Sequence, residues 1–184
     1  MQFATNIYEA IRDFLELGGP VLVVIAWTIF IMWGLILERV LFLRTRMKTL
    51  MDEAVAAWEA RAERQSWEAF RIRERLVSDV KMAANAGLPM IKTLVILCPL
   101  LGLLGTVTGM IEVFDVMAVT GTGNARAMAS GVSKATVPTM AGMVGALSGV
   151  LFATILGGWA NRQVSLLEDR MFTDQGGNDH AAAV

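Results

Sequence analysis

The stretch ATVPTMAGMVGALSGVLFATILGGWAN, residues 135–161, decides the fold class. It contains no Asp, Glu, His, Lys or Arg, and Lys134 and Arg162 flank it directly. A helix needs roughly 20 apolar residues to cross the hydrocarbon core of a bilayer, which is about 30 Å thick. We therefore expect this stretch to form a membrane-spanning helix.

Two further stretches meet the same requirement: LGGPVLVVIAWTIFIMWGLIL at residues 17–37 and TLVILCPLLGLLGTVTGMI at residues 93–111. The 184-residue chain is 55% hydrophobic and only 18% charged, with a mean hydropathy of +0.54. That is too apolar for an ordinary soluble domain. The sequence predicts an all-α membrane protein with three transmembrane helices. The first span should remain as an anchor, because Glu9, Asp13 and Glu16 precede it instead of the basic residues of a signal peptide.

The distribution of Lys and Arg predicts the orientation. Ten basic residues lie in residues 38–87, and Arg162 and Arg170 follow the third span, whereas the other side carries only Arg12 and Arg126. Basic residues accumulate in cytoplasmic segments. We expect residues 38–87 and the C-terminus in the cytoplasm, with the N-terminus outside.

Local signals divide the chain further. Residues 1–16 are expected to form an amphipathic helix on the outer membrane surface, with Asn6 and Glu9 spaced as a capping pair. Breaks are expected near Gln65 and Ser66 and at Gly87 and Pro89. The charged face of the cytoplasmic helices serves either as a solvated surface or as a docking site. The segments expected from these signals are cytoplasmic helices at 38–87, the second span with its extension at 88–119, a short outer loop at 120–130, the third span at 131–161, and a helix with a disordered tail at 162–184.

Small residues recur along the second and third spans. Spacings of three and four residues relate Gly102, Gly105 and Gly109, and the same spacings relate Ala135, Thr139, Gly142, Ala146, Gly149 and Ala153. Small residues let helices approach closely in a membrane. They could pack helices of one chain together, but their extent favours a homo-oligomer.

Two threonines are candidates for a hydrated path. At about 1.5 Å per residue, Thr106 lies about 9 Å inward from Glu112, and Thr139 lies about 7.5 Å inward from Lys134. The two hydroxyls would then share one level. Each could bond a carbonyl of its own helix, or both could line a polar path. Because the second and third spans contain no ionisable residue, any proton carrier in the membrane would have to come from a partner helix.

Charges near the outer ends of these spans form a second candidate feature. Lys134 could form an ion pair with Glu112 or Asp115, or its amine could reach the lipid headgroups. Pro138 cannot donate to the carbonyl of Lys134, so it should bend the third span or free that carbonyl.

Several other functions find no support. The single Cys98 has no partner for a disulfide or a metal site, and His180 lies in a polar tail. A net charge of -1 gives no reason to expect nucleic acid. Glu112 and Asp115 lie at the membrane edge without a nucleophile and base, so an enzyme is not expected. We expect no catalytic residue, metal or cofactor.

The motifs LLGTVTGMIEVF (103–114) and GVSKATVPTMAGMVGAL (131–147) resemble the ExbB/TolQ/MotA family, and ExbB most of all. The resemblance implies a homopentamer in the bacterial inner membrane around an ExbD-like partner, whose membrane aspartate carries protons, the coupling ion. It also implies a TonB-like protein as the driven partner. Thr106 and Thr139 match the family's pore threonines, whereas Lys134 and Pro138 replace a glutamate and a small or aliphatic residue. A TolQ-like role in envelope maintenance and a passive membrane scaffold remain alternatives.

Overall fold

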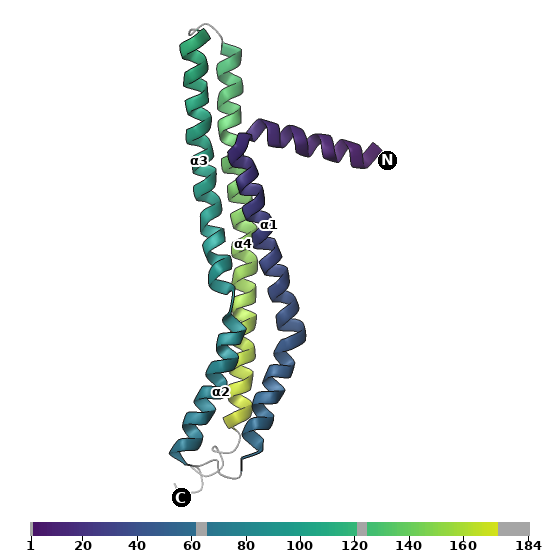
Figure 1. The fold of residues 1–184 in the computed structure, drawn as a ribbon, viewed down its shortest axis with the longest axis vertical. Helices are drawn as coiled ribbons and strands as arrows, with labels where there is room; N and C mark the ends of the chain where they lie inside the picture. Colours follow the sequence, from purple (N-terminus) through teal and green to yellow (C-terminus); the bar gives the residue numbers. More distant parts are fainter. Residues whose placement is uncertain (1, 62–65, 121–124, 173–184) are drawn as a thin grey trace, which may run out of the picture. The chain divides into compact units, whose positions relative to one another are not determined.

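Four helices make up the computed structural model, which describes the backbone of residues 2–61, 66–120 and 125–172 and the side chains of residues 19–61, 66–119 and 128–171. They are α1 (Gln2–Glu59), α2 (Trp67–Asn85), α3 (Leu88–Thr120) and α4 (Ala125–Phe172) (Figure 1). Three stretches are long and apolar enough to cross a membrane: Gly19–Glu59 in α1, Trp67–Val119 through α2 and α3, and Met128–Met171 in α4. The expectation of an all-helical chain with three candidate spans is confirmed.

Helix α1 is interrupted where the first span begins. Gly19 has φ 66° and ψ −168°, a backbone conformation that glycine adopts without a Cβ penalty. Pro20 follows, and its fixed φ suits the first position of the helix that continues to Glu59. The preceding residues are helical from Gln2 onward. Asn6 therefore lies inside this helix, and the expectation that it caps the helix is wrong.

The two breaks expected on either side of α2 occur close to the residues that the sequence indicates. Ser66 caps α2, because its Oγ accepts a hydrogen bond of 3.2 Å from the Ala69 amide. Gly87 has φ 77° and separates α2 from α3. The expected break residue Gln65 lies outside the described residues, as does the tail with His180.

The connection between α3 and α4 is shorter than expected. Helix α3 continues to Thr120, and α4 begins at Ala125. Of the expected loop 120–130, residues 120 and 125–130 are thus helical, and residues 121–124 lie outside the described residues.

The chain forms two compact units. The first comprises Met1–Gly34 and Met90–Leu151, and the second comprises Leu35–Pro89 and Phe152–Val184. In each unit, apolar residues spaced three or four apart form the buried seam of every helix. Members of the first seam are Leu22, Ile25, Met32, Ile91, Val95, Cys98, Ala135, Pro138 and Ala146; members of the second are Leu43, Met47, Ala54, Val80, Leu156 and Leu167.

Candidate functional site: two threonines on the α3–α4 pair

Glycines bring α3 and α4 into close contact in the first unit. A Cβ on Gly142 would lie 2.5 Å from the carbonyl oxygen of Cys98, and a Cβ on Gly109 would lie 2.7 Å from the Cα of Ala135. At Gly149 the nearest atoms are in side chains, those of Val95 of α3 and Met32 of α1. The small residues are thus occupied within one chain. In the sequence alone, the extent of small residues is a reason to expect a homo-oligomer. Because these residues pack within one chain, they do not by themselves indicate an oligomer.

Pro138 lies in this same interface. Its ring is fully buried, and it would overlap any Cβ on Gly105. Helix α4 continues through Pro138 as one helix from Ala125 to Phe172. The proline therefore fills the space that Gly105 leaves open on α3.

Thr139 bonds across the interface. Its Oγ1 donates to the carbonyl oxygen of Gly102 at 3.0 Å. Gly102 allows this contact, because a Cβ there would lie only 3.0 Å from the Cα of Thr139. The hydroxyl proton of Thr139 is thereby engaged, and the remaining lone pair of its oxygen can still accept a hydrogen bond.

Thr106 bonds within its own helix. Its Oγ1 donates to the carbonyl oxygen of Leu103 at 2.7 Å, and the side chain is half-exposed. Gly102 contacts Thr139 and Gly105 contacts Pro138, so Thr106 lies within about one helical turn, ~5.4 Å, of Thr139 along the pair.

Both threonines lie on the side of the α3–α4 pair that faces away from α1. Thr108 lines a cavity against Pro20 of α1, and Thr106 is two residues away, which is a rotation of about 200°. On α4, Val137 and Ala141 line a groove with Ile29 and Trp33 of α1. Thr139 is two residues from each of them, so it also points away from α1. Thr106, rather than Thr108, shares a face with Thr139.

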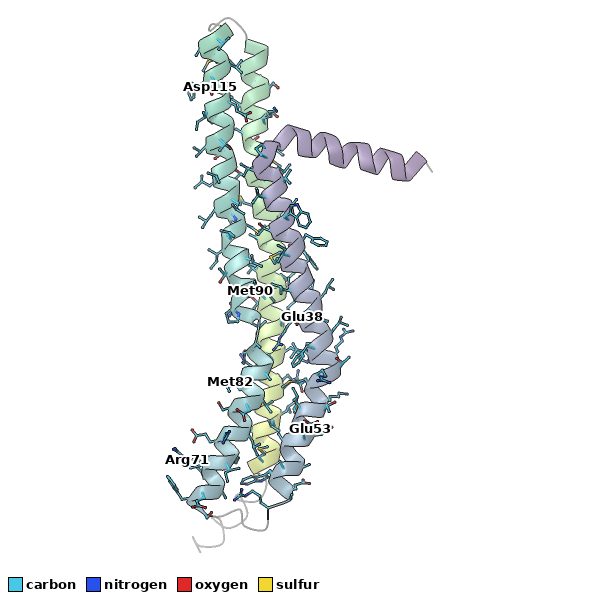
Figure 2. The ribbon with its side chains drawn as sticks, in the orientation of Figure 1. Glu38, Glu53, Arg71, Met82, Met90 and Asp115 are labelled. Carbon is cyan, nitrogen blue, oxygen red and sulfur yellow. The ribbon has the colours of Figure 1, made fainter. Side chains whose placement is uncertain are left out.

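Lys134 and Glu112 meet around a small cavity. The cavity has a volume of about 60 Å³ and is lined by Gly19, Pro20, Val21, Gly105, Thr108, Gly109, Glu112 and Lys134. Asp115 does not line it and lies farther toward the Thr120 end of α3 (Figure 2). Between these three side chains, all of which the structure describes, there is no ion pair. The cavity places Lys134 beside α1 and on a different side of α4 from Thr139.

The second unit holds a separate polar feature that the sequence did not single out. Arg39 is 6% exposed, its guanidinium lies 4.6 Å above the ring of Phe42, and its Nη2 donates to the carbonyl oxygen of Ala83. The sequence did carry a signal for this contact. Arg39 lies three positions after Ile36 and four before Leu43, both of which are buried.

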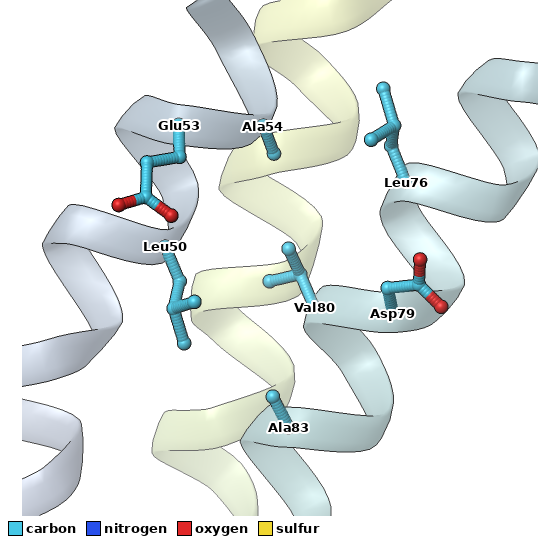
Figure 3. A pocket seen from close by; sticks show the side chains of 7 residues that line it. All are labelled: Leu50, Glu53, Ala54, Leu76, Asp79, Val80 and Ala83. Atoms are coloured by element: carbon cyan, nitrogen blue, oxygen red, sulfur yellow. The ribbon is translucent and has the colours of Figure 1, made fainter. Parts of the chain in front are cut away.

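Beside this contact, α1 and α2 enclose a groove with a volume of about 240 Å³. Leu50, Ala54, Leu76, Val80 and Ala83 give it an apolar lining, and Glu53 and Asp79 are its charged residues (Figure 3). Across the parts of the chain that the structure describes, no group of three His, Cys, Asp or Glu residues could hold a metal ion.

The sequence pattern of the MotA/TolQ/ExbB proton channel family matches residues 41–169. This range includes both threonines, all of α2 and α3, and most of α4. The chain belongs to this family. Members are channels and not enzymes, and with three candidate spans the chain is a multi-pass membrane protein.

Curated relatives carry ExbB names. Biopolymer transport protein exbB1 of Vibrio cholerae is 41% identical over 85 residues, which is 46% of this chain and 37% of the relative. Two Synechocystis proteins, putative biopolymer transport proteins ExbB-like 3 and ExbB-like 1, are 34% and 38% identical over 50% and 48% of this chain. The matched segments cover 48% and 37% of those two relatives, so each comparison spans less than half of the relative's length.

Proposed function

We propose that this chain is the proton-pathway subunit of a bacterial inner-membrane motor. It would act with an ExbD-like partner and use the proton motive force to energise a TonB-like protein for transport across the outer membrane. The observation that carries the proposal is the position of Thr106 and Thr139, near one level on the face of α3 and α4 turned away from α1. Family membership and the names of the ExbB relatives support it.

The chemistry of this face fits a proton that travels on a partner. Both threonine hydroxyls donate to backbone carbonyls, so each presents an accepting lone pair. Such an oxygen can accept from a protonated carboxyl group or from a water molecule that relays its proton. Because residues 93–111 and 135–161 contain no ionisable side chain, the carboxyl group would come from a partner helix against this face.

Assembly follows from the same requirement. A partner helix surrounded by hydroxyl-bearing faces needs several copies of this chain, and we propose a homopentamer with the α3–α4 faces turned inward. The N-terminus would lie in the periplasm and residues 38–87 in the cytoplasm. Each proton that crosses 100 mV supplies about 2.3 kcal/mol, enough to bias a stepwise rearrangement.

Native mass spectrometry of the tagged chain tests the assembly, after extraction from membranes of its own host. We expect five copies with two copies of a small single-span protein that carries a membrane aspartate. A bare homo-oligomer or a monomer, reproduced in several mild detergents, would contradict the motor and favour a passive scaffold. A TolA-associated partner would instead indicate the TolQ-like role.

Substitution of the two threonines tests the pathway. Thr106→Val and Thr139→Val remove the accepting oxygens with little change in side-chain shape. We expect each to lower proton flux through the reconstituted complex while its subunit composition stays unchanged. Thr139→Ser keeps the hydroxyl that bonds Gly102 and should retain flux. Unaltered flux in both valine variants would remove the threonines from the pathway.

A further inference from the structure

The outer half of α4 carries a further hydroxyl, that of Thr136, to which the site formed by Thr106 and Thr139 assigns no role. Among residues 135–148, which form the outer half of the span, the exposed side chains are Thr136, Met140, Met143, Val144 and Leu147. Thr136 is the only polar one among them.

Thr136 is exposed and lies beside Thr139, whose hydroxyl bonds across to Gly102 of α3. It precedes Thr139 by three residues, so the two side chains point within about 60° of each other. Val137, by contrast, lines the groove against α1, and Ala135 is buried against Gly109 of α3. Met140, about 40° from Thr136 around the helix, also lines that groove, whereas Thr136 does not line it and is exposed.

Its hydroxyl has the same chemistry as that of Thr106. The Oγ1 of Thr136 donates to the carbonyl oxygen of Ser133 at 2.9 Å, which leaves an accepting lone pair on the open face. Along the helix, Thr136 lies about 4.5 Å from Thr139, toward the end of α4 that begins at Ala125. Side chains three residues apart are neighbours on a helix surface, where a water molecule can bridge two hydroxyl groups.

We propose that Thr136 holds water at the outer entrance of the proton path, one step before Thr139. This assignment rests on the proposed function, since it needs the open face of α3 and α4 to line a pore. Thr136 positions water and has no proton affinity of its own. It extends the polar lining from the level of the two threonines toward the level of Lys134 and Glu112.

The test compares three variants of the complex purified with its natural partners from its host and reconstituted in vesicles. Thr136→Val removes the hydroxyl, and Thr136→Ser keeps it. Thr28→Val is the matched control, because Thr28 bonds the Val24 carbonyl of α1 at 2.8 Å and lies outside the α3–α4 pair. Proton uptake is measured with a pH-sensitive dye inside the vesicles under an imposed membrane potential.

We expect Thr136→Val to reduce the rate of proton uptake several-fold, while Thr136→Ser and Thr28→Val remain near the wild-type rate. Equal rates for Thr136→Val and wild type would overturn the assignment of Thr136. If Thr139→Val still lowers uptake in that same experiment, the proposed function survives. Loss of uptake in both Thr136 variants would also overturn the assignment, because it would indicate a packing role.

Discussion

Gly142 and Gly157 both belong to α4, but their surroundings differ. A Cβ on Gly142 would lie 2.5 Å from the backbone oxygen of Cys98, whereas a Cβ on Gly157 would meet nothing within 4 Å. In a helix interior, alanine is more favourable than glycine by about 1 kcal/mol. Substitution of alanine for glycine at both positions therefore separates two effects on stability, the cost of crowding between helices and the gain in helix propensity.

We expect Gly142→Ala to lower the free energy of unfolding by about 1–3 kcal/mol, the usual cost of overpacking. Gly157→Ala should be neutral or slightly stabilising. Thermal unfolding of the purified protein in a mild detergent measures both. Equal midpoints for the two variants would show that α3 and α4 do not approach as closely as the structure places them.

The sequence predicted which small residues pack but not what they pack against. Gly102, Gly105 and Gly109 have the spacing of an interface, and the same spacing serves a contact within a chain or between chains. Likewise, Lys134 was expected beside Glu112 or Asp115. The structure places Glu112, and not Asp115, near Lys134, because Glu112 lines the same cavity as Lys134 and Asp115 does not.

At the scale of elements, Arg39 connects α1 to the last turn of α2. Its guanidinium donates to the carbonyl oxygen of Ala83, two residues before α2 ends at Asn85. A cation near the C-terminal carbonyls of a helix also interacts favourably with the helix dipole. Arg39 thus holds α2 just before the break at Gly87, which leads into α3.

We expect Arg39→Met to remove a charge-assisted hydrogen bond that contributes about 1.5–3 kcal/mol. The loss should appear locally, as faster amide hydrogen exchange at the C-terminal end of α2. Arg44→Met serves as the control, because Arg44 is exposed on the same helix. Unchanged exchange at residues 80–86 in Arg39→Met would show that the contact does not hold α2.

The breaks between elements were predictable because their signals are local. Ser66 caps α2 through its own side chain, and Gly87 tolerates a positive φ. The contact of Arg39 was not predicted, because its acceptor lies 44 residues away on the next helix. The position of Arg39 between the buried residues Ile36 and Leu43 indicates that its guanidinium needs a hydrogen-bond acceptor. It does not indicate which group accepts.

For the whole molecule, composition alone indicated the membrane, since three stretches of the chain are apolar over the length of a bilayer. The copy number is different in kind. The glycines of the α3–α4 seam already have contacts within the chain. The number of copies therefore depends on other surfaces, which have no partner within one chain.

The orientation of the molecule can be measured with single cysteines. Cys98 is fully buried, so a Cys98→Ala background removes the only native thiol with little change in packing. Because basic residues gather in residues 38–87, we expect Lys48→Cys in the cytoplasm and Asp115→Cys on the outer side. A membrane-impermeant maleimide should label Asp115→Cys in cells whose outer membrane has been permeabilised. It should reach Lys48→Cys only after the inner membrane is opened. The reverse pattern would place the Lys134 end of the path in the cytoplasm, and Thr136 would then stand at the exit for protons instead of the entrance.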